Sequence, residues 1–140
     1  MATAIFKTSA ATLPGVLVHC RHALAGKPKF LYPGDTILVA QTKAGLRSRQ
    51  KQIRYRMTFR AVRRDVRCET DAIWGKHWPW IVDCADAREL SRPFDISDIQ
   101  VTATQYAQGG TVVYVDPLDD LELQHGGYFD GAAVRFVPTN

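Results

Sequence analysis

The chain has 140 residues, of which 46% are hydrophobic and 23% are charged, and its formal net charge is +4 at pH 7. This length and composition are typical of a soluble globular protein with one core, so we expect a single domain over residues 1–140. They exclude a bilayer-spanning helix, because no run approaches the roughly 18 consecutive apolar residues that such a helix needs.

The first 20 residues, MATAIFKTSAATLPGVLVHC, lack a charged segment ahead of their apolar part. A secretory signal peptide contains such a segment. We therefore expect a cytoplasmic protein that does not associate with membranes.

Cysteine and histidine residues give little indication of a metal. Cys20, Cys68 and Cys84 are an odd number without CxxC spacing, which argues against a disulfide framework or a zinc site. The tetrapeptide HCRH, with His19, Cys20 and His22, suggests a metal site, but no matching second pair exists. We expect neither a metal nor a cofactor.

The first half of the chain contains a predicted helix and a predicted strand. Residues 13–25 predict a helix that begins near Pro14, where proline is tolerated. The apolar run TILVA at 36–40 is typical of a buried strand. Residues 41–52 are polar, basic and contain glycine, which indicates a loop.

Residues 53–61 show the clearest periodicity in the chain. Apolar residues alternate with polar ones, the first set being Ile53, Tyr55, Met57, Phe59 and Ala61 and the second Arg54, Arg56, Thr58 and Arg60. Alternation with a period of two predicts a strand with one buried and one solvated face. We expect the arginines to lie together on the outer face of the sheet.

The second half predicts three more strands. They are WPWIVDC at 78–84, TVVYV at 111–115 and AVRFV at 133–137, and the stretch DARELSRPFDISDI at 86–99 is expected to be a short helical or looped connection. Five or six short strands with small helices predict an α+β fold, a small and partly closed β-barrel.

The basic residues gather in residues 43–67, which we call the basic segment. It holds ten of the 18 Lys and Arg residues but only one of the 14 Asp and Glu residues. Arginines at alternate strand positions lie roughly 7 Å apart, close to the phosphate spacing along one nucleic-acid strand. Arginine also binds phosphate with two hydrogen bonds at once. The alternative is a solvated face whose arginines pair with acids elsewhere in the chain.

All three tryptophans, Trp74, Trp78 and Trp80, fall within seven positions. Trp78 and Trp80 are two residues apart and would share one face of a strand. Pro79 between them lacks an N–H, which places the segment at a sheet edge or a strand entry. A base that leaves its stack needs such flat apolar walls. The alternative is that all three belong to the core.

The order of these features resembles the EVE-type branch of the PUA-like superfamily, which is related to YTH and ASCH domains. Over residues 33–115, a GD precedes the apolar strand, a basic strand follows, and IWG, WPW, RELSRPFDISDI and YAQGG come next. The best-matching positions are Trp78, Trp80, Val82, Leu90, Pro93 and Ile99. The resemblance implies a small β-barrel with packed helices and a binding module, not an enzyme.

The resemblance also implies a nucleic-acid partner, with a flipped and often modified base held in an aromatic pocket beside a basic face. The expected base-pocket residues are Trp74, Trp78, Trp80, Gln41, Thr42 and Tyr106. The expected phosphate-binding residues are Lys43, Arg47, Arg49, Lys51, Arg54, Arg56 and Arg60. The choice between DNA and RNA, the nature of the modification and the oligomeric state stay open.

Two other functions compete with this one. No nucleophile–base pair and no catalytic signature such as GxSxG, HExxH or a P-loop occurs, so we expect no catalytic residues. A small ASCH-like enzyme acting on nucleosides or RNA would depend on Lys43 and Asp71. A protein-interaction domain would use the arginine face to bind an acidic partner.

Overall fold

A computed structural model describes residues 3–29, 31–43, 46–47, 50–95, 112–115 and 131–133. In chain order, its elements are β1 (Thr3–Thr8), α1 (Leu13–His19), β2 (Arg21–Leu24), β3 (Thr36–Gln41), β4 (Ile53–Arg64), α2 (Glu69–Trp74), β5 (Trp80–Phe94), β6 (Val112–Val115) and β7 (Gly131–Ala133). In these residues, no helix is long and apolar enough to cross a membrane.

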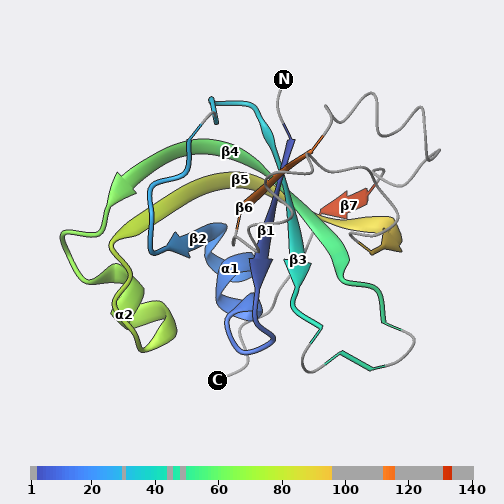
Figure 1. Cartoon of the computed structure of the whole chain (residues 1–140), viewed down its shortest axis with the longest axis horizontal. Helices are drawn as coiled ribbons and strands as arrows, with labels where there is room; N and C mark the ends of the chain where they lie inside the picture. Colours follow the sequence, from blue (N-terminus) through green and yellow to red (C-terminus); the bar gives the residue numbers. More distant parts are fainter. Residues whose placement is uncertain are drawn as a thin grey trace.

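All seven strands form one sheet in the order β2-β5-β4-β3-β1-β6, and β7 pairs with β5 beside this path. Strands β1 and β3 are parallel, and every other pair is antiparallel. The sheet curls so that β4 and β5 arch over α1, while α2 lies beyond their ends (Figure 1). The expected small α+β fold is confirmed, and in place of the predicted partly closed barrel the strands form a curled half-barrel sheet with two short helices.

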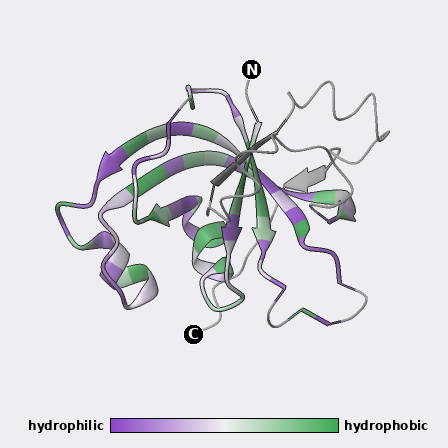
Figure 2. Ribbon diagram, in the orientation of Figure 1, coloured by the Kyte–Doolittle hydropathy of each residue, from purple (hydrophilic) through white to green (hydrophobic). Residues whose placement is uncertain are grey.

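The concave face of the sheet and helix α1 enclose the main core. The fully or largely buried members are Ala4, Phe6, Leu13, Val16, Leu17, Leu24, Ile37, Val39, Met57, Phe59 and Val82. Burial of each large side chain stabilises the fold by about 1.5–3 kcal/mol. Hydrophobic residues dominate β3, whereas β4 and β5 show alternating colours (Figure 2).

Strand β4 follows the predicted alternation only in part. Met57 and Phe59 are buried in the core, and Tyr55 packs against it. Ala61 is exposed, contrary to the prediction, because the register with β5 shifts between Phe59 and Ala61. Beyond this bulge the side chain that packs on the core is Val62. A bulge adds one residue to one strand and thereby exchanges the faces of the residues that follow.

Strand β5 is longer than the sequence predicts. The expected helical or looped connection is wrong for residues 86–94, which continue the strand to Phe94. Asp86, with a φ of 55°, stands where the register shifts again. The long ladder with β4 overrides the weak local preference of this polar stretch. Residues 96–99 lie outside the described residues.

The N-terminal half also differs from the prediction. The helix predicted over 13–25 ends at His19, because Cys20 adopts a left-handed φ of 51° and β2 follows. Strand β1 and helix α2 were not predicted. The strand predicted at 111–115 is confirmed as β6. Of the strand predicted at 133–137, the structure describes only Ala133, which is the last residue of β7.

Candidate ligand pocket and basic surface

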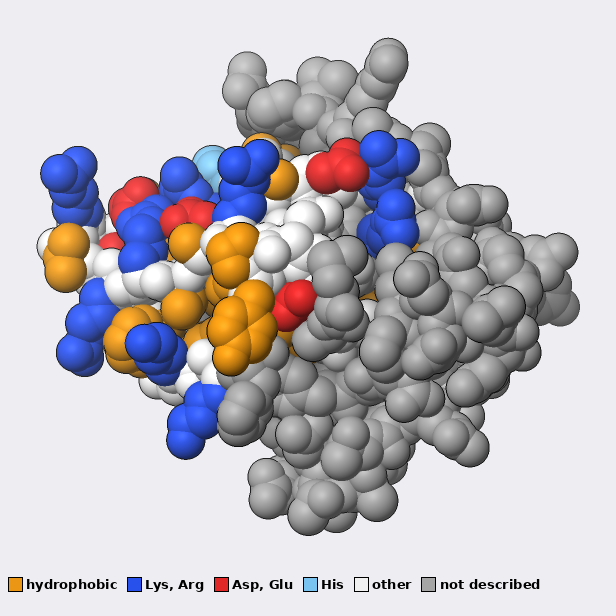
Figure 3. Space-filling model, turned by 90° about the horizontal axis from the view of Figure 1, so that it is seen from above, with side chains coloured by type: hydrophobic (Ala, Val, Ile, Leu, Met, Phe, Trp, Pro, Cys, Tyr) orange, Lys and Arg blue, Asp and Glu red, His pale blue; other side chains and the backbone are white. Residues whose placement is uncertain are grey.

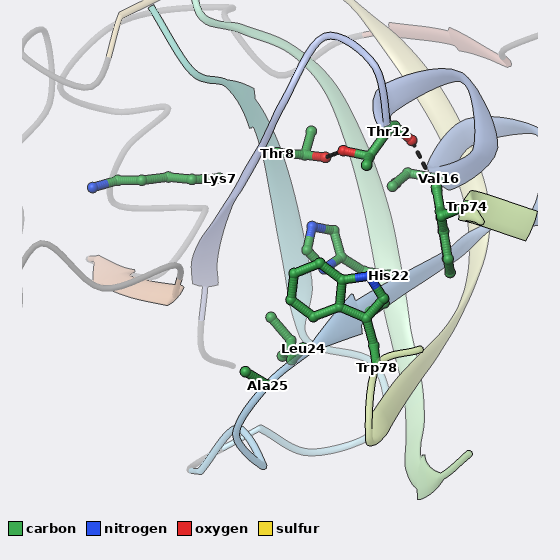
Figure 4. A pocket seen from close by; sticks show the side chains of 10 residues that line it. Lys7, Thr8, Thr12, Val16, His22, Leu24, Ala25, Trp74 and Trp78 are labelled. Carbon is green, nitrogen blue, oxygen red and sulfur yellow. Dashed lines mark hydrogen bonds between the residues drawn. The ribbon is translucent and has the colours of Figure 1, made fainter. Parts of the chain in front are cut away.

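A cavity of about 180 Å³ lies between the end of β1, helix α1, strand β2 and the segment that joins α2 to β5. The side chains that define its chemistry are Thr8, Thr12, His22, Leu24, Trp74 and Trp78 (Figure 4). Lys7 also contributes to its lining. Two aromatic walls, an imidazole and two hydroxyls therefore converge on one small space.

His22 is the buried polar group of this cavity. Its residue is 4% exposed, and its ring makes an edge contact with Phe6 at a centroid distance of 5.0 Å. Within the described part of the chain, neither ring nitrogen has a hydrogen-bond partner. Burial lowers the pKa of His22 to about 4, and the nearby backbone of Ala23 opposes this only weakly. At neutral pH the ring therefore offers one donor and one acceptor.

Trp78 is held at the cavity by a short chain of hydrogen bonds. Its backbone N–H donates to the Thr70 hydroxyl at 2.9 Å, and that hydroxyl donates to the Asp65 carboxylate at 2.6 Å. Asp65 also accepts the backbone N–H groups of Glu69 and Thr70. Burial raises the pKa of Asp65, but these donors outweigh it and lower the pKa to about 2. A charged carboxylate thus fixes both α2 and the loop that carries Trp78.

Trp74 forms a second part of the wall and joins the two helices. Its indole N–H donates to the carbonyl of Thr12 at 3.1 Å. Its ring lies so close to Gly15 that an added Cβ would be 2.6 Å from the indole nitrogen. At the same end of the cavity, the hydroxyls of Thr8 and Thr12 bond each other at 2.6 Å.

Cations lie over two of the tryptophan rings. The Lys76 ammonium is 4.4 Å from the ring centroid of Trp78. Lys27 and Arg64 lie 5.6 and 5.2 Å from the ring centroid of Trp80. Trp80 pairs with Leu24 across the sheet, so it faces the same side as the cavity, although it does not line it. The structure thus separates Trp78, in the loop before β5, from Trp80, the first residue of that strand.

The basic segment divides into paired and unpaired cations. Arg63 forms ion pairs with Glu69 and with Asp83. The hydrogen bonds to Glu69 and Asp83 raise the pKa of its guanidinium, and burial lowers this pKa by a smaller amount. Lys51 pairs with Asp95 at 3.6 Å. In the part of the chain that the structure describes, six arginines of this segment make no ion pair: Arg47, Arg54, Arg56, Arg60, Arg64 and Arg67.

Arg56 and Arg60 lie on the convex face of the sheet, away from the cavity. Their neighbours Met57 and Phe59 point into the concave core, and strand alternation turns the arginines outward. Arg56 stands opposite Arg88 in the β4–β5 ladder, which places like charges face to face. Seen from above, Lys and Arg side chains are spread over this face with Asp and Glu among them (Figure 3).

The other predicted site residues do not line the cavity. Gln41 is buried and accepts a bond of 2.7 Å from Arg54, whereas Lys43 and Arg47 are exposed. The backbone N–H of Thr42 donates to the carbonyl of Thr8. Arg49 and Tyr106 lie outside the described residues.

Sequence reasoning missed His22, Thr8 and Thr12 as pocket residues. His22 drew attention only as part of HCRH, yet His19 of this motif is exposed and Cys20 contacts Met57 through sulfur. An alternation within residues 21–24 was the available signal, because His22 and Leu24 are buried there. Lys43 and Asp71, which the enzyme hypothesis needs, are exposed and lie outside the cavity lining.

A scan against models of known protein families finds no match for this chain, and a search of curated proteins finds none either.

Proposed function

We propose that the protein binds nucleic acid and accepts one unpaired base in the cavity between Trp78, Trp74 and His22. The observation that carries the proposal is the buried His22 ring, whose unpaired nitrogens line an aromatic-walled cavity of about 180 Å³. Pockets for drug-sized ligands measure roughly 300–1,000 Å³. This cavity therefore suits a single flat ring system.

The chemistry of the lining supports a base over other flat molecules. An aromatic side chain stabilises a stacked base by about 1–3 kcal/mol. A neutral imidazole supplies the donor and the acceptor that a base edge requires. The cations over Trp78 and Trp80, which are Lys76, Lys27 and Arg64, would contact the phosphates next to the inserted base.

Membership of the EVE-type branch of the PUA-like superfamily is part of this proposal. It rests on the order of motifs in residues 33–115, and a small curled sheet with two short helices is compatible with it. Within this proposal the base is a modified one, and the protein acts as a reader without catalysing a reaction.

The test is a binding screen with plain and modified oligonucleotides, single- and double-stranded, at two salt concentrations. Trp78→Ala should weaken binding roughly 5- to 150-fold, which corresponds to the loss of one stacking contact. His22→Phe keeps an aromatic ring against Phe6 but removes both nitrogens, so it should reduce discrimination between bases. Tyr32→Ala is the control, because Tyr32 is an aromatic residue that is 68% exposed and outside the cavity lining.

Equal affinity of wild type and Trp78→Ala for every oligonucleotide would exclude the cavity as a base site. Binding of an acidic protein without any nucleic-acid binding at low salt would favour the interaction-domain alternative. Turnover of nucleosides or short RNA that Lys43→Ala abolishes would favour the enzyme.

A further inference from the structure

Three side chains with different metal-binding atoms meet beside helix α2. The sulfur of Cys68, a carboxylate oxygen of Asp71 and a ring nitrogen of His77 all lie within 4.8 Å of one another, and all three residues are exposed. Cys68 precedes the helix and Asp71 lies in its first turn. Gly75 ends the helix with a φ of 72°, and this reversal returns His77 to the same side.

We propose that Cys68, Asp71 and His77 bind a zinc-class transition-metal ion. Thiolate, imidazole and carboxylate are the ligands that zinc uses, with bonds of about 2.0–2.3 Å. In a tetrahedral site such bonds separate neighbouring ligand atoms by roughly 3.3–3.8 Å. Nδ1 of His77 and Oδ2 of Asp71 are 3.7 Å apart, so this pair already has the spacing of a tetrahedral edge.

The surroundings of the cluster favour a cation. Oδ2 of Asp65, whose side chain is fully buried, lies 3.6 Å from the same ring nitrogen of His77, Nδ1, so a second carboxylate adds negative charge beside the cluster. In the described residues, Asp71 makes no ion pair with Lys or Arg, so no resident cation neutralises the cluster. Three protein ligands leave the fourth position for water.

Metal binding would also brace the wall of the cavity. Trp78 follows His77 directly in the chain, and Thr70, one residue before Asp71, accepts the backbone N–H of Trp78. The metal would thus connect the start of α2 to the loop that carries the aromatic wall. The site does not depend on the nucleic-acid proposal, because none of its three ligands lines the cavity.

The experiment titrates the reduced, metal-free full chain with Co²⁺ as a spectroscopic probe and then with Zn²⁺. We expect one equivalent of Co²⁺ to give a thiolate-to-metal absorption band that one equivalent of Zn²⁺ displaces. Cys68→Ser should abolish the band, and His77→Ala should weaken binding at least tenfold. Zn²⁺ should raise the melting temperature of the wild type but not of Cys68→Ser, because a ligand bound only by the folded state stabilises it.

The controls are Cys20→Ser and His19→Ala, which alter the HCRH motif and should leave the band and the affinity unchanged. Absence of a thiolate band at excess Co²⁺ would overturn the proposal. So would a band that survives in the Cys68→Ser, His77→Ala double variant or that disappears in Cys20→Ser. Either of these two results would assign the metal to a different or adventitious site.

Discussion

His22 makes the stability of the protein depend on pH. Its folded-state pKa of about 4 lies below the ordinary histidine value of about 6.5. The unfolded chain therefore binds the proton more readily between these values. The contribution of His22 to the free energy of unfolding is therefore fully present above about pH 6.5. It decreases as the pH falls toward 4, by a total on the order of 3 kcal/mol.

Urea unfolding of wild type and His22→Leu at pH 7 and pH 4.5 checks this prediction. The wild type should lose more stability between the two pH values than His22→Leu, which has no titrating group in the cavity. His19→Leu, at an exposed histidine, should behave like the wild type. Identical losses in wild type and His22→Leu would show that the imidazole can be protonated without unfolding.

At the scale of elements, the two helices are joined where Trp74 covers Gly15. In Gly15→Ala the new Cβ would be 2.6 Å from the Trp74 nitrogen and 3.0 Å from Ile73, so the helices must separate. Overpacking of this kind costs about 1–3 kcal/mol, against which alanine gains about 1 kcal/mol of helix propensity. We expect a lower urea midpoint and altered tryptophan fluorescence.

Gly26→Ala provides the matched control, since no atom lies within 4 Å of its Cβ position. It should change the free energy of unfolding by no more than about 0.5 kcal/mol. Equal stability of the two variants would mean that Trp74 moves away from α1 at no cost.

The start of helix α2 depends on a carboxylate three residues before its N-cap. Asp65 accepts two backbone N–H groups and the Thr70 hydroxyl, so Asp65→Ala leaves three donors without their partner. We expect faster amide hydrogen exchange at Glu69, Thr70 and Trp78 and a lower melting temperature. Asp71→Ala, which removes an exposed carboxylate from the same helix, should change neither in metal-free protein. If amide hydrogen exchange is unchanged in Asp65→Ala, then packing alone, and not the carboxylate, keeps helix α2 ordered.

At the scale of the whole molecule, the curled sheet separates two sets of unpaired cations. Lys27 and Arg64 lie over Trp80 on the side of the cavity, whereas Arg56 and Arg60 lie on the convex face. Each phosphate contact contributes about one unit to the slope of log K against log salt. Lys27→Gln with Arg64→Gln should therefore reduce the slope for oligonucleotide binding by about two.

Arg56→Gln with Arg60→Gln removes the same charge from the opposite face and should leave the slope nearly unchanged. Salt titrations of both double variants by fluorescence anisotropy make the comparison. If the Arg56→Gln, Arg60→Gln variant lowers the slope and the other variant does not, the phosphates bind to the arginines of β4. The alternation of residues 53–61 alone predicts this second result.

The sequence by itself determined those features whose cause is local. Period-two alternation predicted the strand at 53–61, and an apolar run predicted that at 36–40, because a pleated chain half-buried in a sheet imposes these patterns. The clustering of cations in the basic segment and of three tryptophans within seven residues was likewise visible in the sequence.

Only the tertiary structure decided how these features lie relative to one another. A bulge between Phe59 and Ala61 exposed Ala61. Pairing with the long strand β4 extended β5 through a polar stretch, because this pairing outweighs local preference. The curl of the sheet brought His22 of β2 next to Trp78 and placed Arg56 on the opposite face. Such neighbours come from distant parts of the chain, and their proximity follows from the packing of the sheet and helices and not from any pattern within one segment.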